Sequence, residues 1–238
     1  MHFTPFSTGK LALLALSSSI LAQPTVEKRS LIIDLDLAKS FGAVAGTSLN
    51  NTGATSITGD CGTCPGSTIT GFPPGKCSGT SSANDTPGCN AEATCITAYN
   101  NARAQQPTSA LGNADLGGLT FAPGVYTFPG QDAKLTGNVT IDGKSDPKGQ
   151  WIFLINNTFT AAANSRVVTI NGAQACHIYF VAAEAATVGE ASVMQGNILA
   201  YNTITVSNAA SNQGIFCALN GTLTLNNNSI TAQPNCTS

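Results

Sequence analysis

Three kinds of short strand recur in the second half of this chain, always in the same order. The first is strongly apolar, as in WIFLI at 151–155, and the second alternates apolar residues with threonine, as in TITVS at 203–207. The third is a further short strand, such as SIT at 229–231. Gly, Asn, Pro and Asp stand between the strands, where tight turns need them. A repeated three-strand cycle predicts a solenoid, in which each coil buries its apolar faces on its neighbours.

Five such cycles follow one another. The apolar strands are predicted at 124–128, 151–155, 177–181, 197–201 and 214–218. Strands of the second kind are predicted at 133–136, 158–160, 186–189, 203–207 and 222–226. A sandwich of antiparallel hairpins is the alternative, but the strand order keeps the same rotation through all five cycles. The pattern therefore favours a mainly β fold, a three-sided right-handed parallel β-solenoid (β-helix) over 110–232.

One segment is predicted to be an α-helix packed alongside the solenoid, at about 89–106. Ala91, Cys95, Ala98 and Ala102 fall on one face of that helix, and Pro107 stops it. Because this face carries only small side chains, the helix can lie close against a flat sheet.

Charge is scarce in this chain of 238 residues. Only 9% of residues are charged, whereas 42% are hydrophobic, so the composition is not that of a disordered protein. The formal net charge is −2 and no basic cluster occurs, which argues against nucleic acid or an anionic membrane as a partner. We expect a monomer without a cofactor.

The amino-terminal segment has the pattern of a secretory leader. The apolar run LALLALSSSILA follows Lys10, which predicts a signal peptide at 1–22. The dibasic pair Lys28 and Arg29 indicates a propeptide at 23–29, so that a single domain would span 30–238. A membrane anchor is the alternative, but the run is too short to span a bilayer. We expect a secreted, extracellular protein.

Cysteine content agrees with an oxidising compartment. The chain has eight cysteines, all expected in disulfides: Cys61, Cys64, Cys77, Cys89, Cys95, Cys176, Cys217 and Cys236. The first five lie together, and since five is odd, at least one bridge must join them to the later three. We expect them to staple a loop-rich cap. The CGTC motif at 61–64 could suggest a redox or zinc site, but the secretory context favours structural bridges and no metal.

Seven sequons are consistent with secretion and glycosylation. They begin at Asn50, Asn84, Asn138, Asn156, Asn220, Asn227 and Asn235.

Several longer stretches identify a family. They include FGAVAGTSLNNTGATSITGDCGTCPGSTITGFPPG at 41–75, GGLTFAPGVYTF at 117–128, LTGNVTIDGKSDPKGQWIFLI at 135–155, and GNILAYNTITV at 196–206. Over about 40–236 the chain resembles the microbial secreted ice-binding (antifreeze) proteins. The resemblance implies an irregular β-solenoid with one helix and a non-enzymatic protein that adsorbs to ice through one flat face. It also implies that amino-terminal strands form a coil beside the carboxy-terminal coils.

This resemblance makes the threonine-rich strands the candidate face. If the matching positions Phe159, Val188, Val206 and Leu225 point into the core, their neighbours point to solvent. One outward row would then be Thr158, Thr187, Thr205 and Thr224, and the next Thr160, Gly189, Ser207 and Asn226. The full set of predicted ice-binding residues is Ser48, Asn50, Thr158, Thr160, Thr187, Thr203, Thr205, Ser207, Thr222, Thr224 and Asn226.

The sequence also departs from a uniform face. Lys134 stands where the first coil should carry a small outward residue, and Glu184 and Glu190 flank the Thr187 strand. Threonine is moreover a natural outward residue on any solvated strand. A secreted cell-surface or polysaccharide-binding structural protein therefore stays open as the alternative function.

An enzyme is disfavoured by the distribution of its acidic residues. A carbohydrate-cleaving solenoid needs two carboxylates facing each other across a groove. Asp115, Asp132, Asp142 and Asp146 are instead scattered over turns, where aspartate is common in any case.

Overall fold

A computed structural model describes residues 1–2, 32–130, 132–233 and 235. The solenoid and its helix belong to one compact unit, Leu31–Ser238. Most of the predicted signal peptide and the whole predicted propeptide lie outside the described residues. The described part of the chain contains no helix with the length and apolar character that a membrane span requires.

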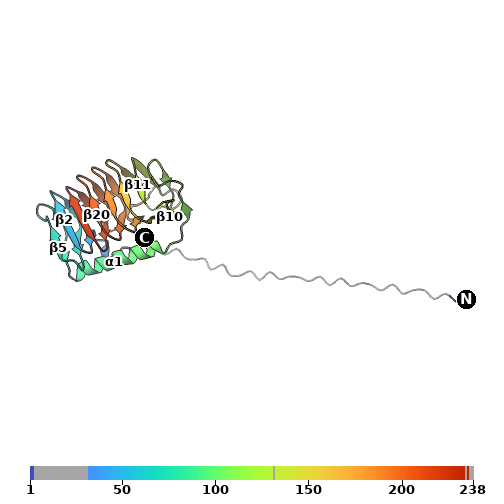
Figure 1. Cartoon of the computed structure of the whole chain (residues 1–238), viewed down its shortest axis with the longest axis horizontal. Coiled ribbons are helices and arrows are strands. Elements are labelled where there is room, and N and C mark those ends of the chain that lie inside the picture. The colour runs from blue at the N-terminus through green and yellow to red at the C-terminus, as the bar shows by residue number, and fades with distance from the viewer. Residues whose placement is uncertain (3–31, 131, 234, 236–238) are drawn as a thin grey trace. The chain divides into compact units, whose positions relative to one another are not determined.

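Three parallel sheets form the three sides of the solenoid (Figure 1). The helix-covered sheet has the order β7 (Ser81–Ala83), β4 (Asp60–Thr63), β1 (Phe41–Ala45), β22 (Phe216–Ala218), β19 (Asn197–Ala200), β16 (Ile178–Ala182), β13 (Trp151–Ile155), β10 (Gly124–Thr127) and β8 (Ser109–Ala110). The threonine sheet has the order β11 (Ala133–Leu135), β14 (Phe159–Ala161), β17 (Ala186–Val188), β20 (Ile204–Val206), β23 (Thr222–Asn226), β2 (Ser48–Thr52) and β5 (Thr68–Thr70). The third sheet has the order β6 (Lys76–Cys77), β3 (Ser56–Thr58), β24 (Ser229–Thr231), β21 (Ser211–Gln213), β18 (Val193–Gln195), β15 (Arg166–Ile170), β12 (Asn138–Asp142) and β9 (Thr120–Phe121).

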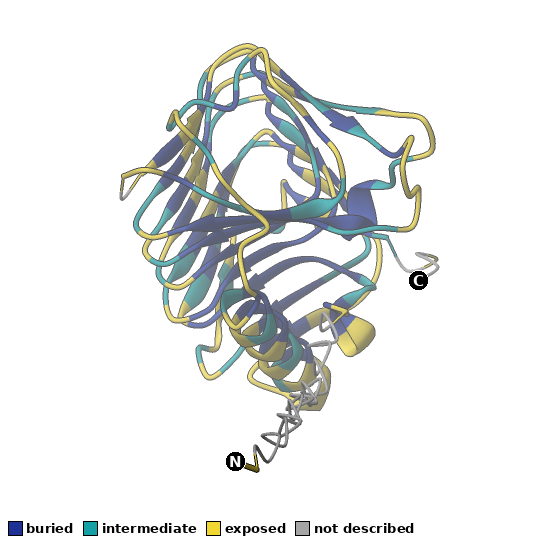
Figure 2. Ribbon diagram, turned by 90° about the vertical axis from the view of Figure 1, so that its right-hand side faces the viewer, coloured by how far each residue is buried: buried dark blue, intermediate teal, exposed yellow. Residues whose placement is uncertain are grey.

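The chain visits the three sheets in turn, so each cycle of the sequence is one coil of the solenoid. Neighbouring strands in these sheets pair in parallel, as β13 does with β16 and β14 with β17. Viewed along the stack in Figure 2, successive coils lie over one another and the buried strands line the interior. The predicted three-sided parallel β-solenoid is confirmed, and the antiparallel sandwich is excluded.

The amino-terminal strands close the stack out of sequence order. β1 lies between β22 and β4, and β2 lies between β23 and β5. The coil made by residues 41–58 is therefore inserted between the last carboxy-terminal coil and the coil that follows it in the chain. This is the arrangement that the family resemblance implied.

Inward-pointing side chains fill the solenoid with one continuous core. Large aromatic side chains stack through it: the ring centroids of Phe153 and Phe180 are 5.1 Å apart, and those of Phe159 and Phe180 are 4.8 Å apart. Trp151 is fully buried, and its indole N–H donates to the carbonyl oxygen of Phe121 at 3.0 Å. Aromatic burial on this scale supplies much of the driving force for stacking the coils.

Helix α1 (Thr86–Arg103) covers the outer surface of the helix-covered sheet (Figure 1). Its predicted small-residue face is confirmed, because Ala91, Cys95, Ala98 and Ala102 are all fully buried. They form a second apolar cluster with outward residues of the sheet such as Val181.

The predicted helix bounds of 89–106 are shifted by three residues at each end. The helix starts earlier because Asp85 caps it, with the carboxylate accepting from the backbone N–H of Gly88 at 3.1 Å, and because proline is tolerated in a first turn. At its other end the helix stops at Arg103. Pro107 disfavours helical backbone angles only at the residue before it, so it predicts that the helix stops but not the residue at which it does so.

A short amino-terminal segment also packs on the helix-covered sheet. It contains the 3-10 helix η1 (Asp36–Ala38), which contacts α1. The backbone of Ile33 donates to and accepts from the side-chain amide of Gln150 at 3.0 and 2.7 Å, and its carbonyl also accepts from the Tyr179 hydroxyl at 3.1 Å. A second 3-10 helix, η2 (Ala175–His177), precedes β16.

Three disulfides tie the helix and the end coil to the stack. They are Cys61–Cys77, Cys64–Cys89 and Cys95–Cys217. The last joins the helix to a late coil, which confirms a bridge between the two groups of cysteines. Cys176 is also disulfide-bonded, whereas Cys236 lies outside the described residues.

The predicted loop-rich cap is wrong. Residues 60–83 form a further coil with strands β4, β5 and β6, followed by β7. These strands have only two to four residues each, so their sequence resembles that of loops.

Candidate binding face

The outward residues of the threonine sheet come from strands of very simple pattern. In β14, Thr160 is exposed between the buried Phe159 and Ala161. Thr205 lies in the same way between the buried Ile204 and Val206 of β20. Because neighbouring residues on a strand point to opposite faces, the inward residues anchor the strand in the core and hold the threonine in solvent.

Strand register aligns these threonines into one line, which we call the central row. The residues that pair across successive strands are Lys134, Thr160, Thr187, Thr205, Thr224, Asn50 and Thr70. Neighbouring strands lie about 4.7–4.9 Å apart, so the side chains repeat at that interval. Threonine is stiff at χ1, and each one presents a methyl group and a hydroxyl at a fixed position.

A flanking row lies two residues before the central row on each strand. In it Ser48 pairs with both Thr222 and Thr68, and Thr203 and Thr158 hold the same position just before β20 and β14. On the opposite side, Asn226 of β23 pairs with Thr52 of β2, and Ser207 follows β20 directly. All the predicted face residues thus lie on this one sheet or next to its strands.

Both predicted rows have the wrong register at β14, because Thr160 pairs with Thr187 and not with Gly189. Phe159 pairs with Ala186 and not with Val188, so Thr160, and not Thr158, stands beside Thr187. A slip of two residues keeps every side chain on its proper face, so the alternating pattern cannot exclude it.

The far end of the face was not predicted from the sequence. Thr68 and Thr70 on β5 belong to the flanking and central rows, and both are exposed. The signal was present as TIT at 68–70, which has the same alternation as TLT at 222–224. The segment lies among the cysteines of the supposed cap, where no strand was expected.

Charged groups around the face are bound to partners within the protein. The Lys134 ammonium lies 3.8 Å from a carboxylate oxygen of Asp115. At the corners beside β17, Glu184 accepts from the Asn202 amide at 2.5 Å and Glu190 accepts from the Asn208 amide at 3.4 Å.

Two aspartates at the β11 end of the face have carboxyls with a lowered pKa. The Thr158 hydroxyl and backbone N–H and the Asn157 amide all donate to Asp132, and these hydrogen bonds lower the pKa of its carboxyl. Burial acts to raise the pKa of Asp115, but hydrogen bonds from Thr136 and the Gly117 N–H, with Lys134 nearby, hold it below its usual value.

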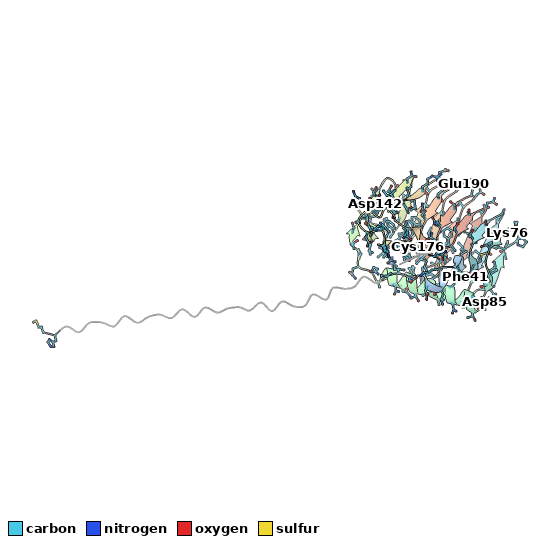
Figure 3. All side chains as sticks on the ribbon, turned by 180° about the vertical axis from the view of Figure 1, so that it is seen from behind. Phe41, Lys76, Asp85, Asp142, Cys176 and Glu190 are labelled. Carbon is cyan, nitrogen blue, oxygen red and sulfur yellow. A yellow bond between two sulfur atoms is a disulfide. The ribbon has the colours of Figure 1, made fainter. Side chains whose placement is uncertain are left out.

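The two other aspartates considered in the sequence, Asp142 and Asp146, accept hydrogen bonds within their own turns. Asp142 accepts from the backbone N–H of Lys144 at 2.9 Å, and Asp146 accepts from that of Lys148 at 3.0 Å. In Figure 3, Asp142 lies toward one end of the stack and Lys76 toward the other. No group of three or more metal-ligating side chains gathers among the described residues.

The two remaining sides of the solenoid present different surfaces. The helix-covered sheet is occupied by α1 through a buried apolar cluster. The third sheet is open, but its exposed residues include Lys76, Arg166, Ile170 and Gln213, which differ in length and charge. The threonine sheet is therefore the open side that carries a row of identical small residues.

Residues 43–231 match the family model described as ice-binding-like. The chain belongs to the ice-binding-like family.

Individual relatives agree with this family assignment. The chain is 38% identical, over 92% of its length and 80% of the relative, to an ice-binding protein of Nostoc sp. (strain HG1). Among solved structures it is similar to an ice-binding protein from the Antarctic ascomycete Antarctomyces psychrotrophicus, with a TM-score of 0.80 and 37% identity over 84% of this chain and 98% of that one. An ice-binding protein from an Antarctic biological consortium gives a TM-score of 0.78 and 33% identity over 92% of this chain and 96% of that one.

Proposed function

We propose that this family member is a secreted ice-binding protein that adsorbs to ice through the threonine sheet and inhibits ice growth or recrystallisation. The observation that carries the proposal is the central row, in which Thr160, Thr187, Thr205 and Thr224 stand in register on four successive strands. The family assignment and the names of the relatives support it.

The physical basis is preorganisation. The row repeats at about 4.7–4.9 Å, a spacing close to those between water molecules in ice. Each threonine offers an apolar methyl group and a hydroxyl on a stiff side chain. An array that is already rigid can order surface water into an ice-like layer with little further loss of entropy.

Secretion and modification form part of the same proposal. The disulfides favour an oxidising compartment, and the sequon asparagines Asn156, Asn220 and Asn227 are exposed. They stand at corners next to the threonine sheet, so glycans there would border the face. We further propose that the protein is a monomer and acts without a cofactor. We propose no catalysis, since Asp115 and Asp132 are engaged by neighbouring hydrogen-bond donors.

The decisive test is Thr205→Arg. A long charged side chain in the middle of the row holds the ice lattice away from its neighbours, so we expect most ice affinity to be lost. Because Thr205 is exposed, the free energy of unfolding should change by no more than about 0.5 kcal/mol. Ice-growth inhibition and partition into slowly growing ice measure the first effect, and a thermal melt measures the second.

Lys148→Ala, in an exposed turn, is the control and should leave ice affinity unchanged. Full ice activity of Thr205→Arg at an unchanged melting temperature would show that this face is the wrong one. Retention of the wild-type protein on cellulose or chitin, with no partition into ice, would support the polysaccharide-binding alternative.

A further inference from the structure

Two positions of the central row do not carry threonine. Lys134 replaces threonine on β11, and Asn50 replaces it on β2, whereas the four strands between them all carry threonine. Beyond Asn50 the pattern returns, because Thr70 of β5 pairs with Asn50 in the same row.

The Asn50 end of the face is a network of side chains that bond to one another. The hydroxyl oxygens of Ser48 and Thr222 are 3.0 Å apart, and the Asn50 amide donates to Ser48 at 3.4 Å. The Thr70 hydroxyl in turn donates to the side-chain amide oxygen of Asn50 at 3.0 Å. Hydroxyls at this end have therefore committed part of their hydrogen-bonding capacity to the protein.

The four middle threonines are different. Within the described residues, the hydroxyls of Thr160, Thr187, Thr205 and Thr224 make no hydrogen bond to another group of the protein, and all four side chains are exposed. Each is free to hold a water molecule in the same way as the next. An ordered water layer needs the same side-chain geometry repeated at the same interval. The planar amide of Asn50 and the long side chain of Lys134 interrupt that repeat.

We propose, on the basis of the function proposed above, that Asn50 and Lys134 set the limits of the ice-contacting row. The contact then comprises the four threonines Thr160, Thr187, Thr205 and Thr224, and Thr70 lies outside it although it shares their register. Asn50 is the more consequential limit, because it separates Thr70 from a row that would otherwise run over six strands.

The first experiment extends the row. Asn50→Thr joins Thr224 to Thr70, and we expect the concentration needed for half-maximal inhibition of ice recrystallisation to fall by at least about twofold, since even a small gain in contact free energy multiplies affinity. Asn50→Gln is the matched control, because it also removes the sequon at Asn50 but keeps an amide in the row. It should show no gain.

The second experiment is a double-mutant cycle. In the wild-type background Thr70→Arg should change ice activity by less than about twofold, and in the Asn50→Thr background it should cancel the whole gain. All these sites are on the surface, so melting temperatures should stay within about 2 °C. Lys134→Thr tests the other limit, and its activity should rise in the same way as that of Asn50→Thr.

The outcomes separate this inference from the proposed function. If Thr205→Arg abolishes ice activity and Thr70→Arg does so too in the wild-type background, the contact runs through Asn50 and the inference is overturned. A lack of gain in both Asn50→Thr and Lys134→Thr, at unchanged melting temperature, overturns it as well. If Thr205→Arg leaves ice activity intact, the proposed function itself fails.

Discussion

At the scale of single residues, Asn212 is the polar side chain least suited to its place. It points inward from β21, pairs with Met194 on one side and Ile230 on the other, and is 3% exposed. Neither its amide nitrogen nor its amide oxygen has a hydrogen-bond partner among the described residues. A buried amide without partners costs about 1–3 kcal/mol relative to an apolar group that fits.

We therefore predict that Asn212→Leu raises the free energy of unfolding by about 1–3 kcal/mol. Asn197→Leu is the matched control and should lower it, because the Asn197 amide bonds to the carbonyls of Cys176 and Ile178 and accepts from the Ile215 N–H. Chemical denaturation of the two variants measures both effects. A loss of stability in Asn212→Leu would contradict the prediction.

Glu92 is a second residue in an unfavourable place. It is a buried carboxyl on α1, one of its oxygens has no partner within the described part of the chain, and burial raises its pKa from 4.5 to about 7. Between these two pH values the folded state keeps a proton that the unfolded state releases. The favourable contribution of this site is present below about pH 4.5 and is lost as the pH rises through about 7.

Glu92→Gln should remove this loss, because the amide carries no charge at any pH. At pH 8 we expect the variant to be more stable than the wild type by about 1–3 kcal/mol, and at pH 4 the difference should be small. Thermal melts of both proteins across this range provide the measurement. Parallel stability curves would show that Glu92 does not titrate in this window.

At the scale of elements, one corner of the solenoid has the same backbone conformation in every coil. Between the threonine sheet and the third sheet the chain always passes through a residue with positive φ: Gly137, Asn164, Ala191, Ala209, Asn227, Gly53 and Gly71. Glycine and asparagine adopt this left-handed conformation readily, whereas alanine is strained in it by about 1 kcal/mol or more. The fold thus dictates the turn even where the sequence does not favour it.

Ala209→Gly should relieve that strain, since φ at Ala209 is 57°. We expect a gain in the free energy of unfolding of about 0.5–1 kcal/mol, reduced somewhat by the greater freedom of glycine in the unfolded chain. Ala210→Gly, at the next position and fully buried in the core, should instead be destabilising. Urea denaturation compares the two, and equal effects would refute the argument.

At the scale of the whole fold, closure of the stack depends on contacts between distant parts of the chain. Residues 43–45 pair with residues 216–218, and the Cys95–Cys217 bridge spans 122 residues. A bridge that closes so long a loop removes more entropy from the unfolded chain than one that closes a short loop.

Replacing both Cys95 and Cys217 by Ala should lower the free energy of unfolding by about 2–5 kcal/mol. The matched double replacement of Cys61 and Cys77, which are 16 residues apart, should cost about 1–2 kcal/mol less. Denaturation under non-reducing conditions measures both. If the short bridge proves the more important, the stability of this fold does not follow from loop length.

Local sequence patterns were sufficient to predict the architecture and the side of each strand that faces solvent. Three strand kinds in fixed order predicted the three parallel sheets, and alternation predicted that Thr205 is exposed between two buried neighbours, as it is. The small residues along 91–102 predicted the helix face. These features are local, because the in-and-out pattern of a strand depends only on its own residues and on burial of one face.

Long-range contacts decided how the coils align and where the uniform row ends. Nothing in a strand three residues long distinguishes a register from one shifted by two, so Thr160 and not Thr158 entered the row only through pairing with β17. The end coil was recognised as a coil only because β5 pairs with β2, which brought Thr70 beside Asn50. Register, closure and the limits of the face depend on contacts between residues far apart in the chain, which no local pattern encodes.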